Sequence, residues 1–216
     1  MRIDPAGYPF VGVAALVALG LALFGHRLWA MVPLVFVAFF LFFFRDPDRA
    51  AILGADDVVS PADGKVMVAG DPEPGVAPPG VWRQISIFLS PLDVHVNRIP
   101  VTGEVSKVEY QPGRFLPAYR HEAARDNERN EVWIDRGGQL VVTRQVVGIL
   151  ARRIVCRVGP GARVLAGQRF GVMKFGSRVD LYLPPGTTLR VTPGDRVRGG
   201  ETVLAVLPPA PHKERD

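Results

Sequence analysis

Two nearly uninterrupted apolar runs dominate the N-terminus of this chain. The first extends from Tyr8 to Gly25 and the second from Leu28 to Phe44, and only His26 and Arg27 separate them. Each run is close to the lower limit of roughly 17–25 residues for a membrane-spanning helix. Two such runs with a short polar link predict a helical hairpin that enters a membrane, either spanning it or lying shallowly within it.

The sequence directly after the second run indicates that the hairpin persists. It has no small-residue pattern of the kind at which signal peptides are cleaved. Arg45 and Arg49 favour the cytoplasmic face of the cell membrane for the rest of the chain, because positive residues are enriched on that side. Arg27, in the link between the two runs, favours the opposite orientation but is a single charge. We therefore divide the chain into a membrane-associated hairpin, residues 1–45, and a second domain, residues 46–216.

The chain beyond the hairpin consists of short β-branched runs separated by turns rich in glycine and proline. Pro61-Ala62-Asp63-Gly64 lies between the apolar runs Val58–Ser60 and Lys65–Val68 and predicts a β-hairpin turn. Arg136-Gly137-Gly138 predicts a second one. The polar stretch 111–130 predicts a loop with one helical turn. The expected fold class is α+β and predominantly β: a compact β-rich domain preceded by a helical hairpin.

Composition restricts the classes of ligand. The net charge is +5, a modest surplus that fits an anionic bilayer surface. No basic run is interleaved with aromatic residues, so we expect no nucleic-acid partner. The single cysteine, Cys156, excludes an internal disulfide, and the sequence has no Cys/His cluster with metal-ligand spacing. We therefore expect no metal site.

Three separate segments carry residues suited to nucleophilic catalysis: Asp63, His95 and Ser177. A serine hydroxyl is a weak nucleophile until a positioned base accepts its proton, and a carboxylate can orient that base. Asp93 is an alternative to Asp63 in the orienting role. The same residue types also occur in serine hydrolases, so that class of enzyme is an alternative. Ser177 lacks, however, the G-x-S-x-G pattern of the α/β-hydrolases.

Several longer motifs surround these residues and follow one another in a fixed order. They are Phe44-Arg45-Asp46-Pro47, Ser60-Pro61-Ala62-Asp63-Gly64, Phe88-Leu89-Ser90-Pro91-Leu92-Asp93-Val94-His95-Val96-Asn97-Arg98, Asn127-Glu128-Arg129-Asn130, Ala151-Arg152-Arg153-Ile154-Val155 and Lys174-Phe175-Gly176-Ser177-Arg178-Val179-Asp180. Together they resemble the phosphatidylserine decarboxylase proenzymes, and in particular the short, membrane-associated form of that family. The resemblance covers nearly all of the chain after Arg45.

The resemblance implies that the chain breaks its own peptide bond between Gly176 and Ser177. The products would be a large β chain, residues 1–176, and a small α chain, residues 177–216, which stay together as a heterodimer. Ser177 would become a pyruvoyl group, a covalent cofactor that forms a Schiff base with the substrate. The mature enzyme would convert phosphatidylserine in the membrane to phosphatidylethanolamine and carbon dioxide, a step of phospholipid biosynthesis.

His95 matches a histidine that the family associates with decarboxylation. An imidazole with an ordinary pKa near neutrality suits a general acid. Longer family members have a second histidine, associated with self-cleavage, where this chain has Arg98. Two alternatives follow: His95 serves both steps, or Asp63 acts in processing with another base. Arg98 could face a phosphate or carboxylate, or lie in solvent.

A non-enzymatic alternative comes from the last third of the chain. Residues 183–204 resemble the hairpins of biotinyl and lipoyl carrier domains, and Met173-Lys174 is similar to a biotinylation site. Lys174 would then be the modified residue of a membrane-tethered carrier or adaptor. The motifs around His95 and Ser177 favour the decarboxylase, because a carrier would need neither of them.

Overall fold

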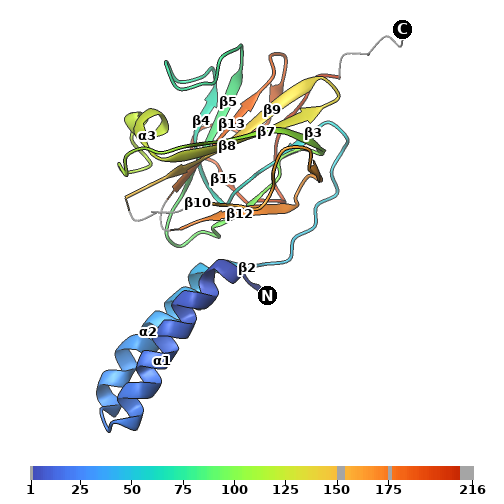
Figure 1. Cartoon of the computed structure of the whole chain (residues 1–216). Helices are drawn as coiled ribbons and strands as arrows, with labels where there is room; N and C mark the ends of the chain where they lie inside the picture. The colour runs from blue at the N-terminus through green and yellow to red at the C-terminus, as the bar shows by residue number, and fades with distance from the viewer. Residues whose placement is uncertain (1, 150–153, 175–176, 210–216) are drawn as a thin grey trace.

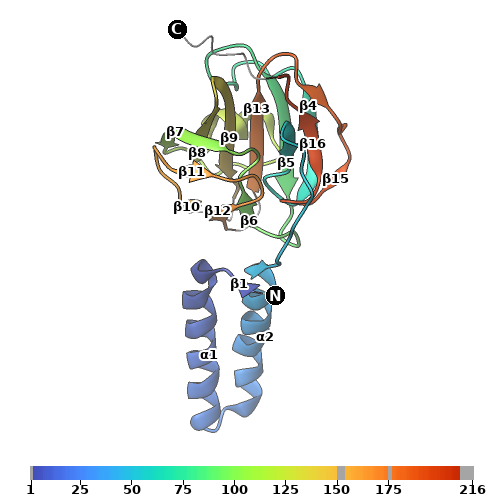
Figure 2. The same ribbon diagram turned by 90° about the vertical axis from the view of Figure 1, so that its right-hand side faces the viewer.

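The two apolar runs form a pair of packed helices in the computed structural model, which describes residues 2–149, 154–174 and 177–209. Helix α1 spans Tyr8–Leu23 and follows the 3-10 turn η1 (Pro5–Gly7), while α2 spans Arg27–Phe43. The pair projects from a β-rich domain in both views (Figures 1 and 2). The expected fold class, a predominantly β domain preceded by a helical hairpin, is confirmed.

The hairpin leaves large apolar side chains uncovered along its length. Leu16, Leu23 and Leu28 are 68 %, 77 % and 82 % exposed. The segment Pro5–Leu23 is long and apolar enough to cross a membrane, and α2 is an apolar helix of shorter length. An apolar surface of this size is unfavourable in water, so it fits association with a membrane.

In the described residues after the hairpin, the regular structure is strands apart from one short helix, α3 (His121–Asp126). Strands β1 (Arg2–Ile3) and β2 (Arg45–Asp46) pair at the base of the helical hairpin. The other strands are β3 (Asp57–Val59), β4 (Gly64–Gly70), β5 (Arg83–Leu89), β6 (Val96–Arg98), β7 (Gly103–Gln111), β8 (Arg129–Arg136), β9 (Gln139–Val147), β10 (Ile154–Cys156), β11 (Arg163–Val164), β12 (Arg169–Met173), β13 (Ser177–Leu183), β14 (Thr188–Leu189), β15 (Arg196–Val197) and β16 (Val203–Val206).

These strands form one large sheet and two small ones around the core. The large sheet has eight strands in the order β11-β7-β8-β9-β13-β5-β4-β15. The small sheets have the orders β10-β12-β6 and β14-β16-β3. Strand β13 therefore lies inside the large sheet, hydrogen-bonded to β5 on one edge and to β9 on the other.

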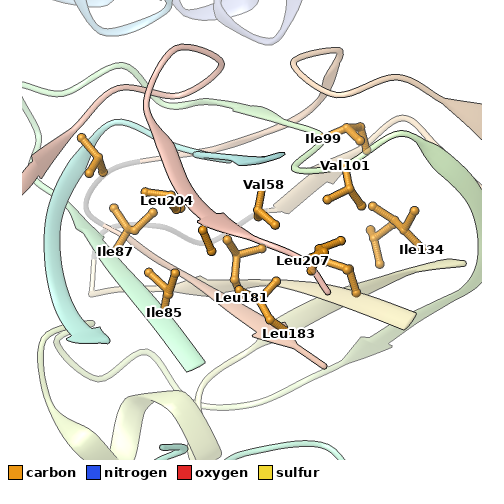
Figure 3. Packing of buried hydrophobic residues seen from close by; sticks show 14 of the residues in the cluster. Val58, Ile85, Ile87, Ile99, Val101, Ile134, Leu181, Leu183, Leu204 and Leu207 are labelled. Atoms are coloured by element: carbon orange, nitrogen blue, oxygen red, sulfur yellow. The ribbon is translucent and has the colours of Figure 1, made fainter. Parts of the chain in front are cut away.

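The two faces of β13 differ in chemistry because successive side chains of a strand point to opposite sides. Leu181 and Leu183 belong to the main apolar core, where they lie near Ile85, Ile87 and Leu204 (Figure 3). Complete burial of one such side chain contributes roughly 1.5–3 kcal/mol. The other face of β13 carries polar side chains that are also buried, so the strand is covered on both sides.

One of the two predicted hairpins is confirmed. Strands β8 and β9 pair across Arg136–Gln139, and Gly137 and Gly138 adopt the positive φ angles, 65° and 94°, that this tight turn requires.

The other predicted hairpin, across Pro61–Gly64, is wrong. Strand β3 pairs with β16, whereas β4 pairs with β5 and β15. Residues 61–63 instead carry the chain from one sheet to another. Proline and Asp-Gly favour a change of direction, but they do not determine which strands pair afterwards.

Gly171 in β12 provides a test of how closely β10 and β12 pack. A Cβ atom at this position would overlap the carbonyl oxygen of Val155 and lie 2.9 Å from the amide nitrogen of Gln145. We expect Gly171→Ala to reduce the free energy of unfolding by about 1–3 kcal/mol. Thermal unfolding measures this loss.

Gly159→Ala is the matched control, because a Cβ atom there meets nothing within 4 Å. Its effect should stay within about 0.5 kcal/mol of zero. Equal melting temperatures for the two variants would contradict the close approach of the strands.

Candidate active site

Ser177 is the first residue of β13 and is fully buried. It pairs with Leu89 on β5 and with Val147 on β9. Directly paired residues of antiparallel strands place their side chains on the same face, as do alternate residues of one strand. The Ser177 side chain therefore shares a face with those of Leu89 and Val179. Its Oγ has no hydrogen-bond partner among the described residues.

Leu89 and Val179, the neighbours of Ser177 on this face, belong to a small apolar cluster that also contains Ala62 and Met173. Ala62 directly precedes Asp63, and the backbone N–H of Met173 donates to the carbonyl oxygen of His95 at 3.3 Å. The cluster thus brings the surroundings of the three predicted site residues together. Gly176, the other half of the predicted cleavage site, lies outside the described residues.

His95 lies just before β6 and is 1 % exposed. Its Nδ1 is 2.9 Å from the backbone carbonyl oxygen of Asp93. A carbonyl only accepts hydrogen bonds, so Nδ1 carries the ring proton and Nε2 carries the lone pair. No described residue offers Nε2 a hydrogen-bond partner. The Phe43 ring, at the end of α2, covers the imidazole with its centroid 4.1 Å away.

Burial lowers the pKa of His95 from 6.5 to about 4, although the backbone hydrogen bond and the charge of Asp93 act in the opposite direction. The imidazole is therefore neutral at neutral pH, which differs from the near-neutral pKa expected from the residue type. In this state Nε2 is a proton acceptor. It can act as an acid only after it has taken a proton from another group.

The carboxylate of Asp63 forms an ion pair with Arg49, in the segment that follows the hairpin. Both of its carboxylate oxygens accept from Arg49, one of them at 2.8 Å, and the backbone N–H of Gly199 donates to it at 2.8 Å. No hydrogen bond joins Asp63 to His95 within the described ranges, although its charge raises the pKa of His95 slightly. The orienting role of Asp63 stays a prediction.

The rival carboxylate, Asp93, orients His95 through its backbone. Its Oδ2 accepts from the backbone N–H of Ser90 at 2.8 Å and from the Ser90 hydroxyl at 2.7 Å. These bonds fix the turn that presents the Asp93 carbonyl to the imidazole.

Arg98 does not lie in solvent, and the carboxylate that it faces belongs to this chain. The side chain is buried and donates to the carbonyl oxygens of Gly167 at 3.0 Å and Pro47 at 2.8 Å. It also forms an ion pair with Asp46 at 3.5 Å. Arg98 therefore holds the segment after α2 against the domain.

Sequence reasoning missed a buried ionic network on the other face of β13. Arg178 is fully buried, and its Nε donates to Asp180 at 2.6 Å while its Nη2 donates to Ser86 at 3.0 Å and to Glu73. Burial alone would lower the pKa of Arg178, but the two carboxylates outweigh it and raise that pKa, so the guanidinium stays charged. The signal was the alternation of Arg178, Asp180 and Tyr182 with apolar residues along one strand.

The described part of the chain contains no cluster of three or more acidic, histidine or cysteine side chains that could hold a metal ion. It does contain a serine hydroxyl and a neutral imidazole, both buried and without partners for Oγ and Nε2. Buried polar atoms in native proteins are nearly always hydrogen-bonded, and exceptions often mark functional sites. A buried hydroxyl and a buried neutral imidazole of this kind fit the active site of an enzyme.

Comparison with known proteins identifies the family. The model of the phosphatidylserine decarboxylase family matches residues 36–205. The phosphatidylserine decarboxylase proenzyme of Geotalea uraniireducens is 43 % identical over 95 % of this chain and 97 % of the relative. The proenzymes of Aromatoleum aromaticum and Pelodictyon phaeoclathratiforme are 46 % and 45 % identical, over 94 % and 82 % of this chain and 94 % and 86 % of each relative. The chain belongs to the phosphatidylserine decarboxylase family.

The lowered pKa of His95 has a consequence for stability. Below pH 6.5 the unfolded chain binds a proton at this residue and the folded chain does not, down to about pH 4. His95 therefore makes the folded state lose stability as the pH falls from 6.5 to about 4, by roughly 3 kcal/mol in total. We expect His95→Gln to remove this part of the pH dependence.

Thermal unfolding of both proteins in the same detergent between pH 4 and 8 measures the effect. The difference in stability between wild type and variant should change most between pH 6.5 and 4. Parallel curves over that interval would show that the folded imidazole has an ordinary pKa.

Proposed function

We propose that this protein decarboxylates phosphatidylserine to phosphatidylethanolamine at a membrane, after cutting itself between Gly176 and Ser177 and converting Ser177 to a pyruvoyl group. The observation that carries the proposal is the buried hydroxyl of Ser177, which has no hydrogen-bond partner among the described residues and lies beside a small apolar cluster. Met173 of that cluster is hydrogen-bonded to the backbone of His95, whose imidazole is buried and neutral. Membership of the phosphatidylserine decarboxylase family supports the choice of substrate.

In the proposed cleavage, Nε2 of His95 accepts the proton of Ser177 Oγ as that oxygen attacks the carbonyl carbon of Gly176. Nε2 returns this proton to the nitrogen of Ser177 as the C–N bond breaks, so that an ester replaces the amide. The neutral imidazole then accepts the α-proton of Ser177, which expels the Gly176 carboxylate, and water converts the resulting dehydroalanine to a pyruvoyl group and ammonia. A neutral imidazole suits the first step, because only its unprotonated nitrogen can accept the proton.

The pairing of β13 supports a product of two associated chains. The α chain, residues 177–216, would begin with β13, and every residue of that strand pairs with β5. Ser177–Tyr182 also pair with β9 on the other edge. Strands β15 and β16 of the α chain pair with β4 and β3 of the β chain, residues 1–176. Separation of the chains would expose all of these backbone groups together with the core.

The pyruvoyl carbonyl supplies the electron sink that decarboxylation of an amino acid requires. The residues present fit such a group at position 177, since Ser177 already occupies a buried site with unused hydrogen-bonding capacity. His95 would hold a proton taken up during the reaction and return it at Nε2. The apolar cover provided by Phe43 would keep water away from that nitrogen.

Residues 1–45 act in this proposal as the membrane anchor, and the catalytic domain, residues 46–216, lies on the cytoplasmic face. The exposed apolar surface of α1 and α2 supports the first part, and Arg45 and Arg49 support the second. The substrate is itself a membrane lipid, so the anchor keeps the enzyme at the surface where its substrate is found.

Intact-mass spectrometry of the purified protein tests the proposal. We expect two chains that together account for residues 1–216, with the small chain beginning at residue 177 and lacking an N-terminal amine. Borohydride reduction in the presence of phosphatidylserine should add substrate mass to the small chain alone. Ser177→Ala should remain one chain without decarboxylase activity, whereas the exposed Ser106→Ala control should behave as wild type. An active, uncut wild-type chain would overturn the proposal.

A second experiment assigns His95. We expect His95→Gln to remain uncut, since the variant lacks the base for the first step, and we expect the exposed His121→Gln to cut normally. The ratio of cut to uncut chain by mass measures both. Normal cutting of His95→Gln without decarboxylation would confine His95 to the second reaction and leave processing to Asp63 with another base.

A further inference from the structure

The two helices of the hairpin enclose an apolar groove that the proposed reaction does not yet use. It has a volume of about 520 Å³, within the usual range for ligand sites. Its lining is entirely apolar: Pro9, Phe10, Val13, Ala14 and Val17 from the first helix, and Pro33, Phe36 and Phe40 from the second. A surface without donors or acceptors can take only an apolar ligand.

One end of this groove continues into the candidate active site through a series of aromatic rings. The ring of Phe10 lies 5.4 Å from that of Phe40 and 5.5 Å from that of Phe44. The Phe44 ring lies 5.0 Å from that of Phe43, which covers His95. The groove is therefore linked to the imidazole of His95 by packed aromatic rings, of which Phe43 and Phe44 are buried.

Lys174 also lies at this end of the groove. The ammonium nitrogen of Lys174 lies 4.7 Å from the centre of the Phe10 ring, a cation–π contact. Lys174 is three residues before Ser177 in the chain. The groove thus begins next to the segment that precedes the pyruvoyl position.

The hairpin is held firmly against the domain, so the groove has a fixed position relative to the site. Buried Asp4 accepts from Arg157 at 2.6 and 2.8 Å, and its backbone N–H donates to the carbonyl oxygen of Phe44 at 2.8 Å. Asp46, after α2, forms an ion pair with Arg169 at 2.6 Å. These contacts bind both ends of the hairpin to the β domain.

From this geometry we infer that the groove between α1 and α2 holds one acyl chain of the phospholipid whose head group reacts. The inference rests on the proposed function and adds a subsite to it. A diacyl lipid has the required shape, because its apolar chain would fill the groove while its polar head group lies at the domain end of the hairpin, where Phe43 covers His95. Lipid tails are as apolar as the groove, so the subsite orients the substrate and adds little affinity.

Bulky substitutions that fill the groove test the inference. Val13 and Val17 line it and are 63 % and 50 % exposed, so phenylalanine can enter without displacing the helix packing. The control places the same bulk on Val32 and Val35, which are 53 % and 66 % exposed and lie outside the groove. Self-cleavage should be complete in both double variants, as measured by intact mass.

Decarboxylation is then compared for dioleoyl and dihexanoyl phosphatidylserine in mixed micelles. We expect V13F/V17F to lower kcat/KM for the long-chain lipid roughly tenfold or more, because misplacing a bound substrate weakens catalysis strongly. The dihexanoyl lipid, whose chains are too short to fill the groove, should react at the wild-type rate. V32F/V35F should match wild type on both lipids.

Photolabelling gives a second, independent readout. Phosphatidylserine with a diazirine in one acyl chain should label the groove residues of the uncut Ser177→Ala protein more than the outward face around Val35. Equal loss of activity on both lipids, or no loss on either, would overturn the inference, as would uniform labelling of the hairpin. Absence of decarboxylation of either lipid by the wild type would instead overturn the proposed function.

Discussion

The double pairing of β13 is the constraint on which the rest of this structure depends. The strand is hydrogen-bonded along both edges from its first residue, Ser177. One of its faces contributes Leu181 and Leu183 to the main core, and the other carries the buried Arg178 and Asp180. A substitution that shifted its register by one residue would exchange these two sets of side chains. Both the core and the ionic network therefore require the register that also fixes Ser177.

The hairpin and the domain are separate units in the sequence but share a packed interface in the structure. Phe43 and Phe44, the last residues of the apolar runs, are fully buried, and Phe43 covers the imidazole of His95. The segment after them is held by Arg98 and by the pair of Arg49 with Asp63. The second apolar run has the sequence of a membrane anchor, and its last residues also determine the electrostatic environment of His95 in the candidate site.

Local patterns in the sequence predicted the elements well and their partners less well. Apolar runs and turn residues located the two helices and the β8–β9 hairpin, because each depends on residues that are close in the chain. The pairing of β3 with β16 joins Val59 to Val203, and nothing near Pro61 or Asp63 records that partner. The same limit applies to Arg98, whose neighbours in space, Pro47 and Gly167, are distant in sequence.

Motifs in the sequence made Ser177, His95 and Asp63 the candidate site residues, and their roles stay predictions. The structure places the first two beside one apolar cluster. The pKa of His95 could not be predicted, because it depends on burial beneath Phe43 and on a carbonyl two residues away. Nor could the pairing of Asp63 with Arg49, which forms only after the segment following the hairpin has docked.

The position of Ser177 at the start of a central strand has a further consequence for the proposed product. A chain terminus normally frays, because its last residues have few contacts. A terminus created at Ser177 would be held by neighbours on both edges from its first residue. Folding would already fix the backbone of this terminus, at an entropic cost of about 1–2 kcal/mol per residue. A mobile terminus would have to pay this entropic cost each time that substrate bound. A carbonyl there would meet every incoming amine from the same direction.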